Sequence, residues 1–222
     1  MIPIIYENDE LLIINKPAGL AVQGGQGVVH SVDRDFAEQL GYKIYLVHRL
    51  DKDTSGLMVV TKNPVAARKW TKLIGSKVAR KEYLALCAGR MPSKSGVIKE
   101  DVIQHGDSKA AVTHYQVEKE WIVPYENENG TGEIPLCLIR LQLETGRMHQ
   151  IRIHLAKQGC PIAGDDQHGN FKLNKKLWKN FRIKHLLLCS YKLTLPIKGK
   201  MQTFEIDLPE DMKGRIGGGE CL

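Results

Sequence analysis

The sequence lacks the features that mark membrane, secreted and zinc-binding proteins. No apolar run approaches the roughly 20 residues that a membrane-spanning helix needs. The N-terminus has no cationic segment followed by a long apolar one, so a signal peptide is not expected. The five cysteines lie far apart and include no C-x-x-C pair, which argues against a zinc site and a disulfide framework. A reducing cytoplasm is the simplest location for such a chain.

Glycine-rich phosphate loops and helical metal pairs are missing as well. The glycines of residues 20–27 fit neither the G-x-x-x-x-G-K-[ST] nor the G-x-G-x-x-G spacing. His149 and His154 stand five positions apart, whereas a helical metal pair needs a spacing of four. We therefore expect no nucleotide-phosphate loop and no metal site.

The composition is that of an ordinary soluble protein with a basic surface. The chain has 222 residues, of which 42% are hydrophobic, enough for one good core or two small domains. Its net charge of +7 comes from 32 basic and 25 acidic residues, which suits a polyanionic partner such as nucleic acid. Because the chain has no long basic tail, the fold must assemble any such binding surface.

Short apolar runs predict strands, and a few longer stretches with helical spacing are interspersed irregularly, which favours an α+β fold. Strands are expected at residues 2–6 and 11–14 (a hairpin), 78–88, 112–120, 136–143 and 185–195. Helices are expected after a Ser31 cap with a stop at Gly41, after Asn63-Pro64, and from 144 to about 158 with Met148, Ile151 and Leu155 buried.

One polar segment lies between two apolar runs in the stretch YLVHRLDKDTSGLMVVTK, residues 45–62. The runs predict two strands, and Thr54-Ser55-Gly56 predicts a turn. Cationic neighbours favour the ionised form of Asp51, which suits a nucleophile at neutral pH. The alternatives are a merely charged loop and a hydrolase pair of Asp51 and Asp53, although the same cations would leave that pair without an acid.

Basic and polar residues gather in two further stretches. The residues of TGRMHQIRIH, 145–154, would place cations at the first turn of a helix, an anion-binding geometry. The stretch KLNKKLWKNFRIK, 172–184, interleaves Trp178 and Phe181 with lysines, which suits phosphate contact or, alternatively, a solvated helix over a core.

Four of these segments, in order, resemble motifs of one family. HRLD followed by TSGL, residues 48–51 and 54–57, resembles the central motif of the RluA family of pseudouridine synthases. NKPAGLAVQGG resembles the family's opening motif, most like RluC-type members that act on large-subunit ribosomal RNA. KEYLAL resembles its tyrosine motif, and GRMHQIRIHLA its third motif. The resemblance covers residues 15 to 195.

The resemblance implies roles for particular residues. Asp51 would be the catalytic nucleophile, attacking either the sugar or the base, and Arg152 would keep it ionised. Tyr83 would stack on the uracil and remove the C5 proton. Arg49 would fill the space that the flipped base leaves, or hold a phosphate. The resemblance and the basic stretches together suggest RNA or substrate contacts at Arg49, Arg147, His149, Gln150, Lys175, Lys176, Leu187 and Leu188.

The resemblance also implies a mixed, largely antiparallel sheet in two halves flanking a catalytic RNA-binding cleft. It implies a single catalytic domain over residues 1–222, without the S4 domain of many relatives, and no cofactor. We expect a flexible tail at 214–222, a monomer, and RNA as the partner, ribosomal rather than transfer RNA. The remaining alternatives are the same chemistry on transfer RNA and a non-catalytic RNA-binding module on the same fold. His168 departs from the family pattern, which usually has tyrosine there.

Overall fold

The computed structural model describes residues 1–104, 106–127 and 130–216. The chain forms two compact units. Unit 1 comprises Met1–Glu82 and Cys189–Asp207, and unit 2 comprises Tyr83–Leu188 and Leu208–Leu222. The chain passes from unit 1 to unit 2 within strand β5 (Arg80–Ala88) and returns within strand β11 (Leu188–Ile197).

Unit 1 is built on a sheet in the order β1-β2-β4-β11. Strands β1 (Ile4–Glu7) and β2 (Leu11–Lys16) form the predicted hairpin, and β2 pairs antiparallel with β4 (Ser55–Thr61). The short strand β3 (Tyr45–Leu46) also pairs with β4, and β12 (Lys200–Glu205) pairs with β11. Only the β4–β11 pair is parallel among the pairs of described residues in this sheet, so the mixed, largely antiparallel architecture is confirmed.

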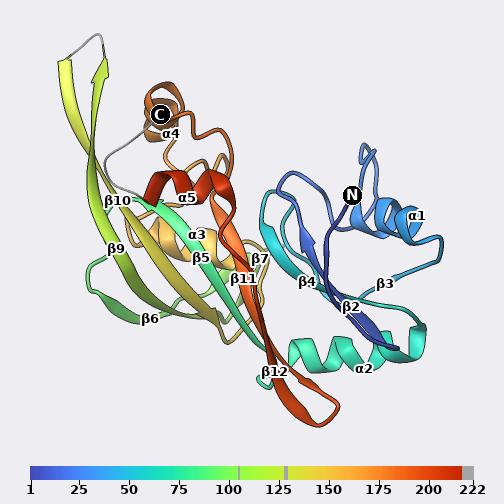
Figure 1. The fold of residues 1–222 in the computed structure, drawn as a ribbon. Helices are drawn as coiled ribbons and strands as arrows, with labels where there is room; N and C mark the ends of the chain where they lie inside the picture. Colours follow the sequence, from blue (N-terminus) through green and yellow to red (C-terminus); the bar gives the residue numbers. More distant parts are fainter. Residues whose placement is uncertain (105, 128–129, 217–222) are drawn as a thin grey trace. The chain divides into compact units, whose positions relative to one another are not determined.

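Helix α2 (Pro64–Gly75) covers the core of unit 1 (Figure 1). The predicted Asn63 cap is confirmed, because its Oδ1 accepts a hydrogen bond of 2.8 Å from the Ala66 amide. The helix buries Ala66, Trp70 and Ile74 against the sheet, whereas Val65 is 68% exposed. The core cluster is completed by Leu11, Ile13, Val47, Leu57, Val59, Ala79, Leu193, Leu195 and Ile197.

The helix expected after Ser31 is present in altered form. A π-helical turn, η1 (Val32–Phe36), leads into α1 (Ala37–Leu40), which ends at Gly41 in the left-handed region as predicted. The expected Ser31 cap is wrong, because its Oγ donates to the Asp33 carboxylate and accepts no helix amide.

The Thr54-Ser55-Gly56 turn was also misplaced. Strand β4 already begins at Ser55, because Ser55 and Gly56 pair with Cys189 and Ser190 of β11. The turn instead spans residues 51–54, where the Thr54 amide donates to the Asp51 carbonyl at 3.2 Å. Pairing with a strand more than 130 residues away overrides the local turn signal.

Unit 2 contains the sheet order β5-β10-β9-β6. The long strands β9 (Val112–Asn127) and β10 (Gly130–Leu143) form an antiparallel ribbon (Figure 1), which a bulge interrupts opposite Leu138 and Ile139. Strand β6 (Ser95–Lys99) pairs with β9, and β7 (Val102–Gln104) and β8 (Asp107–Lys109) form a separate pair. The predicted strands at 78–88, 112–120 and 136–143 are thus confirmed, the second and the third being longer than expected.

The described residues of unit 2 form the helices α3 (Gln150–Lys157), α4 (Phe171–Phe181) and α5 (Glu210–Ile216). Helix α3 begins six residues later than predicted, so Met148 lies outside it and is 45% exposed, while Ile151 and Leu155 are buried as expected. Residues 214–216 of the expected flexible tail end α5, and 217–222 lie outside the described residues. No helix in the described part of the chain is long and apolar enough to cross a membrane.

Candidate active site

Asp51 lies in unit 1, at the first position of the turn that joins β3 to β4. Its side chain is half-buried, and Thr54, which closes the turn, is 3% exposed. The turn therefore holds the Asp51 carboxylate just before β4, and the pairing of β4 with β2 and β11 fixes the position of that strand. This is the position that a catalytic side chain needs if its geometry is to be set by rigid elements.

Lys16, the last residue of β2, anchors this turn through a hydrogen bond to its backbone. Its side chain is fully buried, and Nζ donates hydrogen bonds to the carbonyls of Pro17, Leu20 and Lys52 at 2.8–2.9 Å. Burial lowers the pKa of Lys16 to about 8, and the carboxylates of Asp53 and Asp51 oppose that shift. The ammonium thus joins two loops and places a positive charge near Asp51.

Sequence reasoning missed Lys16 as a functional group. The available signal was a lysine at the end of an otherwise apolar strand, LLIINK, immediately before a proline. A buried ammonium must be hydrogen-bonded or paired, so a lysine in such a strand is expected to have a specific partner.

His48 has a structural role beside the turn. Its Nε2 accepts a hydrogen bond of 2.9 Å from the amide of Val59 in β4. Val59 is adjacent to Val60, which pairs with Leu46, the last residue of β3. Burial lowers the pKa of His48 to about 3, and the charge of Lys81 adds to the shift, so the ring is neutral. Arg49, the next residue, has an exposed side chain, as an RNA contact requires.

Arg152 lies on α3 in unit 2 and is 3% exposed. Its Nε and Nη2 donate to the two carboxylate oxygens of Asp165 at 2.8 and 2.7 Å, a bidentate pair. Burial works against the charge of Asp165, but the bonds from Arg152 and from the amides of His168 and Gln167 hold its pKa below the usual range. A guanidinium has five N–H donors, and Asp165 accepts from two of them.

Asp165 is the second group that sequence reasoning missed. It lies in GDDQHG, where either of two adjacent aspartates could be the buried one. The structure distinguishes them: Asp165 is 1% exposed, while the side chain of Asp166 is 78% exposed and its Oδ1 is 3.8 Å from Arg152.

The segment before α3 is a loop that Gln150 organises. The Gln150 side chain is 2% exposed, and its Oε1 accepts from the Thr145 hydroxyl at 2.8 Å and from the Arg147 amide at 3.0 Å. Its Nε2 donates to the Val112 carbonyl and the Thr113 hydroxyl. These four bonds explain why the helix starts late, and they leave the exposed Arg147 side chain on a fixed loop.

His149 has a left-handed backbone (φ 54°) and precedes α3. Its Nδ1 lies 2.8 Å from Nε2 of His168, so one ring donates to the other. The tyrosine expected at position 168 from the family pattern is thus replaced by a ring that pairs with the loop before α3.

Tyr83, Leu187 and Leu188 belong to unit 2 as well, and all three are buried. Backbone bonds connect their segments: the Leu86 amide donates to Leu187, the Leu187 amide to Ala163, and the Ala163 amide to Leu86. These bonds fix β5, the chain before Asp165, and the start of β11 as one assembly. Glycine at position 164 permits this close backbone packing, since a Cβ there would lie 2.1 Å from the His185 carbonyl oxygen.

Most of the basic stretch 172–184 lies in α4, which ends at Phe181, and the Asn170 side chain caps the start of this helix. Lys175 is exposed, and Lys176 donates to the Tyr125 hydroxyl at 2.6 Å. At the end of the helix, Lys184 lies over the Trp178 ring at 4.5 Å. Within the described residues, no three His, Cys, Asp or Glu side chains gather in an arrangement that could hold a metal ion.

The comparisons with known proteins agree on one family. Residues 10–157 match the family model for RNA pseudouridylate synthase. The chain is 36% identical to ribosomal large subunit pseudouridine synthase C of Rickettsia prowazekii, over 96% of this chain and 70% of that protein. It is 32% identical to ribosomal large subunit pseudouridine synthase D of Haemophilus influenzae, over 94% and 68%. It spans only 56% of the C enzyme of Rickettsia typhi, at 38% identity.

A solved structure gives the same result. Human RNA pseudouridylate synthase domain containing 4 superposes with a TM-score of 0.72 at 26% identity, over 94% of this chain and 89% of that one. The fold is therefore that of pseudouridine synthase domains, as the four sequence motifs predicted. With a family model that matches 148 of its 222 residues, the chain belongs to the RNA pseudouridylate synthase family.

Proposed function

We propose that this protein isomerises uridine to pseudouridine in large-subunit ribosomal RNA, with Asp51 as the nucleophile. The observation that carries the proposal is the Asp51 turn, which strands β3 and β4 frame and the buried Lys16 anchors, in a chain similar to enzymes named for that activity. The exposed Arg49 and the positive charge of the chain suit an RNA substrate.

The reaction breaks the bond between N1 of uracil and C1′ of the ribose and forms a bond between C5 and C1′. The C5 proton is lost and N1 gains one, so atoms and electrons balance without a redox partner. The target base must first leave its stack, at a cost of a few kcal/mol. Asp51 attacks the sugar or the base and is expelled when the new bond is complete.

In this proposal, Arg152 orients and stabilises the Asp51 carboxylate, and the two bonds to Asp165 hold the guanidinium. Tyr83 stacks on the uracil and removes the C5 proton, and Leu187 and Leu188 form an apolar wall that excludes water. Arg49 takes the place of the flipped base or holds a phosphate. Arg147, His149 and the lysines of α4, Lys175 and Lys176, contact the RNA, whereas Gln150 acts by holding the Arg147 loop.

The test uses large-subunit ribosomal RNA transcribed in vitro, which carries no modification. The wild-type protein should form pseudouridine at one or a few positions, detected by carbodiimide labelling and primer extension. Asp51→Asn should abolish product, at least about 10⁴-fold in rate, while its RNA affinity stays within about twofold, because a nucleophile is removed without loss of the binding surface.

Asp53→Asn is the matched control, since it removes a carboxylate from the same turn. It should retain substantial activity. Equal loss in the two variants would contradict the assignment of Asp51, and product formed only on transfer RNA would contradict the proposed substrate. The expectation of a cytoplasmic monomer stays a prediction, to be checked by cell fractionation and by sedimentation.

A further inference from the structure

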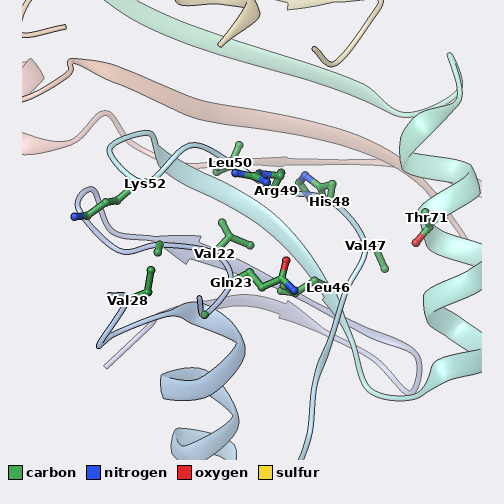
Figure 2. A pocket seen from close by; sticks show the side chains of 12 residues that line it. Val22, Gln23, Val28, Leu46, Val47, His48, Arg49, Leu50, Lys52 and Thr71 are labelled. Atoms are coloured by element: carbon green, nitrogen blue, oxygen red, sulfur yellow. The ribbon is translucent and has the colours of Figure 1, made fainter. Parts of the chain in front are cut away.

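Unit 1 contains a cavity beside the Asp51 turn, and most of its lining residues have no role in the proposal above (Figure 2). Its volume is about 620 Å³, within the usual range for small-molecule sites. Its walls come from three segments: the loop 21–24 with Val28, the stretch 46–50 with Lys52, and Thr71 of α2. Asp51 is not among these lining residues, although residues on both sides of it are.

The lining combines apolar walls with a few polar groups and two cations. Val22, Val28, Leu46, Val47 and Leu50 supply apolar surface, and Gln23, His48 and Thr71 supply hydrogen-bonding groups (Figure 2). Arg49 and Lys52 carry positive charge, and none of the twelve described lining residues is an aspartate or a glutamate. Apolar walls with a few polar groups suit a heterocyclic base, and the cations suit a phosphate.

The state of His48 defines one of these polar groups. Because Nε2 accepts from the Val59 amide, the neutral ring carries its proton on Nδ1. His48 is therefore fixed as a donor, suited to a carbonyl oxygen or ring nitrogen of a base. The Gln23 amide can donate and accept, so it can adapt to more than one base.

Two of the lining residues are close to Asp51 in the sequence. Arg49 precedes Asp51 by two residues and Lys52 follows it directly, so these parts of the rim lie within about 8 Å of Asp51 measured along Cα positions. An unstacked RNA strand that presents a uridine to Asp51 would thus bring a neighbouring nucleotide to the cavity. Single-stranded RNA is commonly recognised through bases splayed out in this way.

We propose that this cavity receives the base of a nucleotide adjacent to the target uridine, with Arg49 and Lys52 holding its phosphate. The statement that the bound strand is the RNA substrate rests on the proposed function, whereas the cavity and the chemistry of its lining do not. The site would contribute to target choice by requiring that a second base leave its stack next to the uridine.

The first test fills the cavity from α2. Thr71 is exposed at its rim, so Thr71→Trp places a large ring there without entering the core. Val65→Trp is the matched control, because Val65 lies on the same helix, is 68% exposed and is not a lining residue. Equal melting temperatures would show that both variants fold.

We expect Thr71→Trp to raise the Kd for a labelled ribosomal RNA transcript, and the KM for modification, about tenfold, the size of one lost base contact. Its kcat should stay within about twofold of wild type, and Val65→Trp should change neither quantity. Indistinguishable Kd values for the two variants would overturn the proposal. The Kd comparison does not depend on turnover. If the protein bound RNA without forming product, the proposed function would be refuted, and the Kd values would still decide whether the cavity binds a base.

The second test removes single bases from the RNA. In a fragment that the wild type modifies, an abasic nucleotide within two positions of the uridine, on one side, should raise KM about tenfold. Thr71→Trp should add no further loss on that fragment, because base and cavity form one interaction. Additive losses, or no effect at any flanking position, would overturn the proposal.

Discussion

Single residues around Asp51 act through charge and hydrogen bonding at short range. Lys16 is the clearest case, because its three bonds use all three donors of an ammonium. A neutral amine has only two N–H donors, so deprotonation costs one carbonyl its donor and removes a positive charge near Asp51. With its pKa lowered to about 8, this change falls within a measurable range.

We therefore expect turnover to fall as pH rises through about 8, with Lys16→Met less active at pH 7 and flat across that range. The sign for stability is opposite: between about 8 and the unfolded value of 10.5 the unfolded chain binds more protons, so this group raises the free energy of unfolding as pH increases. Rate profiles from pH 6 to 10 and urea unfolding at pH 7 and 9.5 separate the two effects. The same alkaline limb in Lys16→Met would assign it to another group.

The Arg152–Asp165 pair predicts a second residue-level effect. Asp165→Asn removes a carboxylate that accepts two bonds from a buried guanidinium, and breaking such a pair from one side costs about 3–5 kcal/mol. Turnover should fall as well, because the guanidinium loses its orientation. Urea unfolding and rate measurements check both.

Asp166→Asn is the control for that experiment. The side chain of Asp166 is 78% exposed and its Oδ1 is 3.8 Å from Arg152, so its loss should change stability by less than about 1 kcal/mol. Similar costs for the two variants would contradict the special role of Asp165.

At the scale of elements, close backbone approach fixes the strand that follows the Asp51 turn. Gly56 of β4 has φ 109°, and a Cβ there would lie 2.3 Å from the Ser190 carbonyl oxygen of β11. Gly56→Ala should cost at least about 2 kcal/mol, from strain and from separation of the parallel pair. Gly75→Ala should be neutral or stabilising, since its Cβ meets nothing within 4 Å. Chemical denaturation of both variants tests this, and equal stability would count against it.

The elements also show what a sequence can and cannot predict. Strands with strong apolar runs, the Asn63 cap and the Gly41 stop were predicted correctly, because each depends on neighbours along the chain. The turn at 54–56 and the start of α3 were wrong, because β11 pairing and the buried Gln150 amide decide them from a distance. Asp51 stays a prediction from its motif, whereas the bonds of Lys16 and Asp165 could be found only from the contacts of the fold.

At the scale of the whole molecule, cysteines far apart in the sequence come together. Cys87, Cys137 and Cys160 lie in unit 2, with the sulfurs of Cys137 and Cys160 3.3 Å apart, and Cys189 is buried in unit 1. Burial raises the pKa of the Cys87 thiol, with its sulfur neighbours adding to the shift. The sequence spacing gave no sign of this cluster.

We expect these four thiols to react with iodoacetamide at least about 100-fold more slowly in the folded protein than in 6 M guanidinium, because they become accessible only when the protein opens. Mass spectrometry of the labelled peptides measures each site separately. Rapid labelling of Cys137 or Cys160 at neutral pH would show that unit 2 opens readily.

The Lys16 ammonium joins the loop that forms part of the cavity wall to the Asp51 turn. Its Nζ donates a hydrogen bond to the Leu20 carbonyl, directly before the cavity wall at 21–24, and another to the carbonyl of Lys52, the residue directly after Asp51. Lys16 thus connects the loop that begins the cavity wall with the turn that carries the proposed nucleophile through a single nitrogen atom. Lys16→Met removes that connection, so we expect the two loops to move independently in this variant.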